Sequence, residues 1–191
     1  MTMVLGLREN GYVYMAADSV AAGAELTVIR KEAKLFWNGP YLIGFCGSFR
    51  FGQIVKFCEL PRMPLELFGG DDNKVEGFFV REFVPALQDA MEDSGINHDD
   101  LNESSLMVGV GQYLFIIEPG FQVSSYMHDY AALGVAEQAG LVGLDVISGG
   151  LPENRLNRVL ESIEKHSIYV KRPWVFGNTS EVDNNSDNDQ K

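Results

Sequence analysis

Basic residues are scarce in this chain of 191 residues, which has 15 Lys and Arg against 27 Asp and Glu. The formal net charge of −12 argues against nucleic acid or an anionic membrane surface as the main partner. The chain has no apolar run long enough to span a bilayer, and its first residues lack a secretory pattern. We therefore expect a cytoplasmic protein with neither a membrane nor a nucleic-acid partner.

Cysteine and histidine are also rare. Cys46 and Cys58 lie in apolar stretches and form no metal-spaced set, so two reduced core thiols are expected. The three histidines are scattered along the chain. A glycine-rich phosphate loop is missing as well, so the chain is not expected to hydrolyse ATP itself. The sequence predicts no metal site and no cofactor.

Strands cluster in hairpins along this sequence, whereas helices come in pairs. Strands are predicted at 4–8, 12–17, 34–37, 41–46, 105–109, 113–118, 122–127 and 174–176. Helices are predicted at 49–60, 75–93, 136–146 and from residue 152 onward. This order fits an α+β fold, a four-layer αββα sandwich of two antiparallel sheets with a helix pair on each outer face. Burial on both sides would explain why the strands are almost continuously apolar.

Three local signals refine this picture. The Asn10-Gly11 pair predicts a tight hairpin between the first two strands. Pro85 predicts a kink within the helix at 75–93. Residues 178–191 are polar and acidic and lack core-forming side chains, so they are expected to form a disordered tail behind a single domain at 1–177.

Thr2 follows the initiating methionine and opens the first strand. If Met1 is removed, Thr2 carries a hydroxyl and a free α-amine, which together make a nucleophile with a built-in base. The ordinary pKa of such an amine, about 7.7–8.0, leaves a sizeable minority unprotonated at neutral pH. Threonine is common at this position, so its meaning depends on the residues spaced behind it.

Counted from Thr2 as position one, Asp18 is residue 17 and Lys34 is residue 33. An ammonium near Thr2 would lower the pKa values of the amine and hydroxyl, and a carboxylate beside the lysine would keep it charged. Gly47 ends a strand and opens a helix, so its backbone N–H could point at a developing oxyanion. Glu164 and Ser167, three residues apart near a helix end, could present a carboxylate and a hydroxyl to the amine.

Three stretches of the sequence together resemble the proteasome β-subunit family: Thr2 with 16–19, then 33–36, and then 44–48. The resemblance spans roughly 2–176, and its specific part is the first fifty residues. It is nearest to bacterial and phage proteasome-like peptidases and to the peptidase subunit of the two-component bacterial ATP-dependent protease. Membership would imply an N-terminal-nucleophile hydrolase with the αββα fold.

The resemblance implies a role for each residue. Thr2 would be the nucleophile and its amine the general base, Lys34 would lower the pKa of the hydroxyl, and Asp18 would hold Lys34. The Gly47 N–H would form the oxyanion hole. Glu164 and Ser167 stand where the family has an Asp-x-x-Ser pattern that orders the amine; here the pattern begins with the longer Glu.

The sequence departs from the family in one further place, which leaves alternatives open. Val135 stands where the family often has a serine that bonds the amine, so one hydrogen bond, worth on the order of 1 kcal/mol, would be lost. A retained Met1 would block the amine altogether. The alternatives are a catalytically inactive structural subunit of such an assembly and a small-amide hydrolase that uses the same nucleophile.

The family's primary specificity pocket maps onto Ala21, Glu32, Phe45 and Phe49. The two phenylalanines would make this pocket apolar, and Glu32 at its rim would favour a basic substrate side chain. Equally, the phenylalanines could be core residues and Glu32 a solvated charge. The implied partners are a peptide or unfolded protein as substrate, further copies of the chain in a homo-oligomeric ring, and a ring ATPase that unfolds substrates.

Overall fold

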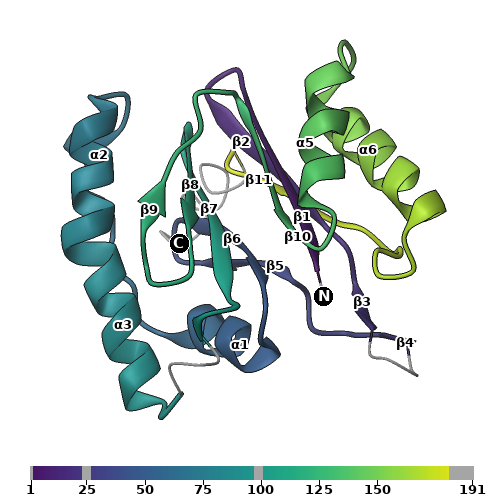
Figure 1. Cartoon of the computed structure of the whole chain (residues 1–191). Helices are drawn as coiled ribbons and strands as arrows, with labels where there is room; N and C mark the ends of the chain where they lie inside the picture. Colours follow the sequence, from purple (N-terminus) through teal and green to yellow (C-terminus); the bar gives the residue numbers. More distant parts are fainter. Residues whose placement is uncertain (1, 23–26, 97–100, 181–191) are drawn as a thin grey trace, which may run out of the picture.

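Two antiparallel sheets lie face to face between two layers of helices in the computed structural model of the chain (Figure 1). The structure describes residues 2–22, 27–96 and 101–180. The helices of the first half of the chain cover one sheet, and the two helices near its end cover the other (Figure 1). This arrangement confirms the predicted αββα sandwich.

The first sheet has four strands in the order β10-β1-β2-β11. Their bounds are β1 Met3–Glu9, β2 Tyr12–Ala17, β10 Tyr130–Gly134 and β11 Val175–Asn178. Strand β1, which follows Thr2 directly, therefore has a hydrogen-bonded neighbour on each side. Asn10 and Gly11 adopt positive φ values of 53° and 81° between β1 and β2, which confirms the predicted hairpin turn.

The second sheet has five strands in sequence order. Their bounds are β5 Leu35–Asn38, β6 Tyr41–Cys46, β7 Ser105–Val110, β8 Tyr113–Ile117 and β9 Val123–Ser124. A short separate hairpin is formed by β3 Val20–Ala22 and β4 Thr27–Ile29. No strand was predicted at these positions, because each of the two strands has only three residues.

Helices α1 Phe49–Phe57, α2 Asp72–Phe78 and α3 Val84–Asp93 pack on the five-stranded sheet, and α5 Glu137–Val146 and α6 Pro152–His166 pack on the four-stranded sheet. Alternation along β1 explains the layering. Met3, Leu5 and Leu7 join the core under α5 and α6, whereas Val4 joins the core between the two sheets. A short 3₁₀ turn, Leu65–Leu67, lies in the connection before α2.

The predicted kink at Pro85 takes a different form. Helix α2 continues into a π-helical segment, Phe79–Phe83, and α3 then begins with Pro85 in its first turn. Proline has no N–H to donate to the preceding turn, so an irregular turn before it is expected. The π segment directs Phe79 and Phe83 into the core, where both contact the Tyr41 ring.

The described fold continues past residue 177, the predicted boundary of the domain. Asn178 belongs to β11, and the Thr179 hydroxyl accepts a hydrogen bond from Val13 N at 2.9 Å and donates one to Gly111 O at 2.6 Å. The rest of the predicted acidic tail, 181–191, lies outside the described residues. Among the helices that the structure describes, none combines the length and apolarity that a membrane crossing requires.

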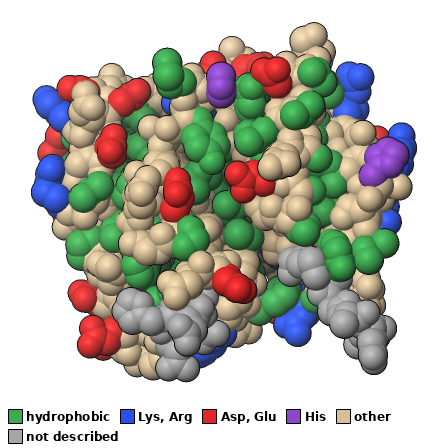
Figure 2. Space-filling model, in the orientation of Figure 1, with side chains coloured by type: hydrophobic (Ala, Val, Ile, Leu, Met, Phe, Trp, Pro, Cys, Tyr) green, Lys and Arg blue, Asp and Glu red, His purple; other side chains and the backbone are tan. Residues whose placement is uncertain are grey.

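Basic, acidic and apolar side chains are unevenly distributed over the molecular surface. Figure 2 shows Lys and Arg side chains mainly at the rim of the face drawn, with acidic and apolar side chains across its middle. Several large apolar side chains are well exposed on the α5–α6 side, namely Val142, Val146, Leu151 and Ile168.

Candidate active site

Thr2 lies in the interior, at the point where β1 enters its sheet, and only 2% of it is exposed. Its carbonyl oxygen accepts a hydrogen bond from Val135 N at 2.9 Å. Gly134 pairs with Met3 in the strand register and has a φ of 110°, and a Cβ on it would collide with the Thr2 carbonyl. Glycine is therefore required beside Thr2, both for the backbone conformation and for the close approach.

Asp18 and Lys34 form a fully buried ion pair directly behind Thr2. The Lys34 Nζ lies 3.0 Å from each carboxylate oxygen of Asp18 and also donates to the Val20 carbonyl. The same carboxylate accepts hydrogen bonds from Met3 N at 2.8 Å and from Val20 N at 3.0 Å. One carboxylate oxygen of Asp18 thus links the Lys34 ammonium to the peptide nitrogen that follows Thr2.

Strand pairing explains how Asp18 reaches this place. The β1–β2 ladder pairs Val4 with Ala17, so the next residues along, Met3 and Asp18, face each other, and Asp18 N donates to Met3 O at 3.1 Å. The Asp18 side chain then folds back onto the Met3 N–H. The short β3 strand supplies both main-chain groups of Val20 to the pair.

Removal from water shifts the pKa values of both members of this pair. Burial raises the pKa of Asp18, while the Lys34 charge and the hydrogen bonds from Met3 and Val20 oppose that rise. Burial likewise lowers the pKa of Lys34, and the Asp18 carboxylate opposes that shift. The Asp18 carboxylate therefore favours the charged form of Lys34 against the effect of burial.

Lys34 is also tied to the strand that leads to Gly47. Its carbonyl accepts a hydrogen bond from Phe45 N at 3.0 Å, two residues before Gly47. Gly47 has a φ of 101°, and a Cβ there would lie 2.6 Å from the Glu103 carbonyl oxygen. Helix α1 starts immediately afterwards, with the Ser48 hydroxyl accepting from Arg50 N at 3.2 Å as its N-cap.

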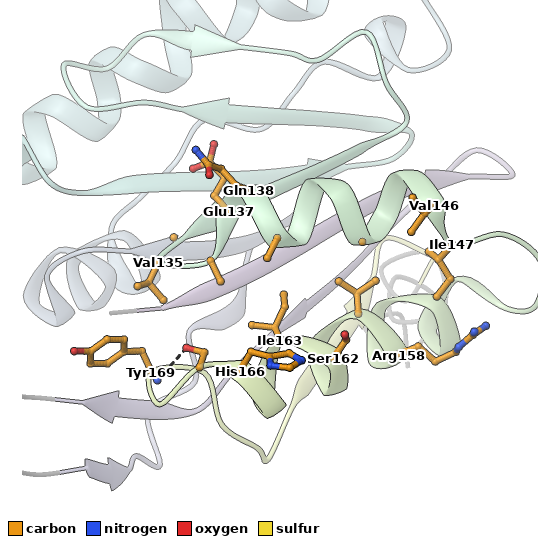
Figure 3. A pocket seen from close by; sticks show the side chains of 16 residues that line it. Val135, Glu137, Gln138, Val146, Ile147, Arg158, Ser162, Ile163, His166 and Tyr169 are labelled. Atoms are coloured by element: carbon orange, nitrogen blue, oxygen red, sulfur yellow. Dashed lines mark hydrogen bonds between the residues drawn. The ribbon is translucent and has the colours of Figure 1, made fainter.

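Glu164 and Ser167 lie at the C-terminal end of α6, and their side chains bond the segment that follows. The Glu164 carboxylate accepts from Arg172 N at 3.1 Å and from Arg172 Nε at 2.9 Å. The Ser167 hydroxyl accepts from Tyr169 N at 3.1 Å, as Figure 3 shows. This segment reaches the Asp18 strand end through Lys171, whose carbonyl accepts from Ser19 N at 3.4 Å.

The contacts of Glu164 determine the direction in which its pKa is shifted. Its partial burial alone would raise the pKa, but the hydrogen bonds and charge of Arg172 outweigh burial and lower it. Among the described contacts, Glu164 is therefore a partner of Arg172, and on this side of Thr2 the backbone N–H of Val135 bonds the Thr2 carbonyl.

A groove of about 930 Å³ runs between α5 and α6, and its lining includes Val135, the N–H of which bonds the Thr2 carbonyl. Val135, 45% exposed, lines one end together with Ser167 and Tyr169 (Figure 3). The side chains of Glu137 and Gln138, in the first turn of α5, point away from His166 and Tyr169 (Figure 3). Burial and the neighbouring carboxylate of Glu118 raise the pKa of Glu137.

The four residues assigned to the specificity pocket occupy different environments. Phe45 is buried among the aromatic core residues, with its ring against Gly52, where a Cβ would collide with it. Phe49 is half-buried, and the Arg30 guanidinium lies 4.4 Å from its ring centre. Ala21 is half-buried in β3. Glu32 is exposed and lies 4.0 Å from Arg30.

The structure thus bonds Lys34 to Asp18 and Asp18 to the N–H of Met3, the residue after Thr2, and it brings Gly47 to the end of the strand that Lys34 contacts. Sequence reasoning missed the contributions of Val20 and Gly134, which act through backbone groups and leave no side-chain signal. Gly134 had one available sign, since it ends an apolar stretch that turned out to be strand β10. Within the described residues, no group of three or more His, Cys, Asp and Glu side chains could hold a metal ion.

Comparison with known proteins by sequence finds no matching family model and no matching curated protein. Solved structures do match. Eukaryotic HslV from Trypanosoma brucei has a TM-score of 0.65 at 16% identity, covering 93% of this chain and 98% of HslV. BPH from Thiobacillus denitrificans, in complex with epoxomicin, has a TM-score of 0.71 at 13% identity, covering 93% and 97%.

Anbu, the ancestral beta-subunit from Yersinia bercovieri, has a TM-score of 0.63 at 14% identity, covering 93% of this chain and 81% of Anbu. All three align over nearly the whole chain despite very low identity, so they establish the fold. The chain has the fold of the proteasome-like N-terminal-nucleophile hydrolases.

Proposed function

We propose that the chain is a threonine endopeptidase whose nucleophile is Thr2, exposed as the first residue once Met1 has been removed. The observation that carries this proposal is the buried Asp18–Lys34 pair, bonded through one carboxylate oxygen to the Met3 N–H. A buried ion pair is costly to maintain, and hydrophobic residues of similar volume would often be as stable. Its presence next to the residue that follows a potential nucleophile is best explained by catalysis.

The first step is acylation. The Thr2 hydroxyl oxygen forms a bond to the carbonyl carbon of a peptide, and its proton passes to the Thr2 α-amine. The carbonyl oxygen becomes an oxyanion that the Gly47 N–H stabilises. Collapse of this intermediate breaks the C–N bond, and the proton held by the amine moves to the departing nitrogen.

The second step is hydrolysis of the resulting ester. The α-amine, again neutral, accepts a proton from water, the oxygen of which attacks the ester carbon. Collapse then releases the acid and returns a proton to the Thr2 oxygen. Through both steps Lys34 supplies positive charge that favours the alkoxide-like oxygen, and Asp18 keeps Lys34 in place.

The proposed substrates are peptides and unfolded proteins, and the proposed working form is a homo-oligomeric ring served by a ring ATPase. Support comes from the similarity in fold to HslV and from the exposed apolar side chains on α5 and beyond it, such as Val142, Val146 and Ile168. Large apolar side chains at such exposure are typical of surfaces that become buried on assembly.

A second candidate is a catalytically inactive subunit of the same kind of assembly. It is favoured by Val135, the side chain of which cannot hydrogen-bond the amine, and by the engagement of Glu164 with Arg172. In that case the Asp18–Lys34 pair would serve only to hold the N-terminal strand.

Hydrolysis of a fluorogenic peptide set by the full-length protein tests the proposal. The wild-type protein and Thr2→Ser are expected to release fluorophore, while Thr2→Ala is expected to lose activity without losing assembly, measured by size-exclusion chromatography. Inert wild-type protein in an intact assembly would support the structural subunit. Turnover of small amides but not of peptides would point to a small-amide hydrolase instead.

A further inference from the structure

The antiparallel ladder between β6 and β7 stops at Gly47. Its last pair is Cys46 with Ser105, so the next pair along the register would be Gly47 with Ser104. At that point the backbone of Gly47 turns to a φ of 101° and the chain leaves the sheet to start α1. The main-chain hydrogen bonding of the ladder therefore has to be replaced by something else.

The replacement is the side chain of Ser104. Its hydroxyl oxygen accepts a hydrogen bond from Ser48 N at 3.2 Å, across 56 residues of sequence. Ser104 is 3% exposed, and its own N–H donates to Leu101 O at 3.1 Å, which anchors its backbone. A fixed, buried acceptor thus determines the direction of the Gly47–Ser48 peptide.

Packing adds a second restraint at the same place. A Cβ on Gly47 would collide with the Ser104 hydroxyl and would lie 2.7 Å from the Ser104 Cα. The backbones at Gly47 and Ser104 are therefore in close contact, and only glycine permits it. With the Ser48 N–H bound to Ser104, the Gly47 N–H is the candidate donor of this turn for an oxyanion.

We propose that Ser104 is a positioning residue for the oxyanion hole: by holding the Ser48 N–H, its hydroxyl restrains the backbone turn at Gly47, so that the Gly47 N–H, in the preceding peptide, faces the developing negative charge. The inference rests on the proposed function, because an oxyanion forms only if Thr2 acylates. Ser104 touches neither substrate nor reacting atoms and acts through the turn. Preorganised donors of this kind stabilise transition states because they need no rearrangement during the reaction.

The test compares two electrophiles on full-length protein. A β-lactone acylates Thr2 through an oxyanion, whereas a peptide vinyl sulfone adds the Thr2 oxygen to a carbon–carbon double bond and forms no carbonyl oxyanion. Ser104→Ala is expected to slow acylation by the β-lactone about tenfold, a smaller effect than the 10²–10³ for removing an oxyanion donor itself. Its rate with the vinyl sulfone is expected to stay near that of the wild type.

Ser105→Ala is the matched control, since Ser105 is the adjacent residue, is also buried, and pairs with Cys46. It is expected to keep the wild-type ratio of the two rates. Ser104→Cys preserves volume and weakens the acceptor, so it should fall between Ser104→Ala and the wild type. Equal slowing of both electrophiles in both Ser104 variants would overturn the proposal, because a purely structural role affects both reactions alike.

Amide hydrogen exchange separates this inference from the proposed function. In Ser104→Ala the Ser48 amide is expected to lose protection while the amides of β6 keep theirs. Unchanged protection of Ser48 would overturn the positioning role whether or not the protein is active. If the wild-type protein reacts with neither electrophile, while Ser104→Ala still shows the loss of Ser48 protection, the proposed peptidase function is contradicted instead.

Discussion

The two sides of Thr2 are built differently. On one side, Asp18, Lys34 and the Met3 N–H form a closed set of buried hydrogen bonds. On the other, the Thr2 carbonyl accepts a hydrogen bond from Val135 N and lies against Gly134, and the side chains at the end of α6 bond the segment that follows. The first side follows from strand register, which places Asp18 opposite Met3.

This difference shows which parts of a site a fold fixes. A residue on a central strand has its position set by the ladder and by the core on both faces, so its role survives large changes in sequence. A residue at a helix end depends on which side chain it meets. In this chain the strand side of the site therefore follows from the sheet register, whereas the helix side depends on the particular side chains that meet there.

The largest expected effect lies on the strand side. Lys34→Met leaves the Asp18 carboxylate buried without its ammonium, so it should abolish peptidase activity and destabilise the fold by about 3–5 kcal/mol. Adding Asp18→Asn removes the unpaired charge, so the double variant should recover part of the stability but no activity. Urea unfolding and peptide hydrolysis measure the two effects, and recovered activity in the double variant would contradict the assigned role of Lys34.

On the side of Thr2 that Val135 bonds, Gly134→Ala tests the close approach of the Gly134 backbone to the Thr2 carbonyl. The substitution introduces strain of about 1–3 kcal/mol at a φ of 110° and pushes the Cβ against the Thr2 carbonyl, so activity should fall strongly. Gly149→Ala is the matched control, because Gly149 has a φ of 70° but open space around it. If both variants lose equal activity, backbone strain alone rather than displacement of Thr2 would be responsible.

A gain of activity is expected when the side chain of Val135 is replaced by one that can form a hydrogen bond. Val135→Ser supplies a hydroxyl near the N-terminal amine while keeping the backbone N–H that holds the Thr2 carbonyl. One added hydrogen bond worth about 1 kcal/mol corresponds to a rise of about fivefold in kcat. Val135→Ala controls for the loss of the valine side chain. A kcat for Val135→Ser no higher than that for Val135→Ala would mean that a side chain at this position does not reach the amine.

The smallest effect is expected at Glu164. Its pKa is lowered below the ordinary value of 4.5 by Arg172, so the pair stabilises the fold above that value, and the stabilisation is lost as pH falls through the lowered pKa. Glu164→Gln should reduce Tm by a few degrees at most at pH 7, and the difference should vanish in acid. Thermal unfolding against pH checks this. A large drop in kcat would show that Glu164 acts on the amine instead.

Much of the fold could be predicted from the sequence because its signals are local. Asn10-Gly11 fixed the first hairpin, and the apolar runs of β6, β7 and β8 gave the buried sheet. Strand β10 was missed as a strand because its Tyr130–Gly134 run is short and its pairing with β1 spans most of the chain. The β3–β4 hairpin was missed because each of its strands has only three residues, shorter than the runs that identify a strand.

The candidate site divides in the same way. Thr2, Asp18 and Lys34 could be named from spacing and resemblance, since each is a side chain with chemistry of its own. Val20 and Ser104 could not, because one acts through its main chain and the other through a contact 56 residues distant in sequence. The bonding of Glu164 by Arg172 depends on where the chain turns after α6, which no local pattern encodes.

The central claim is that Thr2 becomes the N-terminal residue and reacts there. Intact-mass spectrometry of the natively assembled protein, before and after incubation with epoxomicin, tests it most directly. The account predicts a chain that lacks Met1 and gains one inhibitor, with the adduct mapped to Thr2 and absent from Thr2→Ala. A chain that retains Met1 and gains no inhibitor would contradict it.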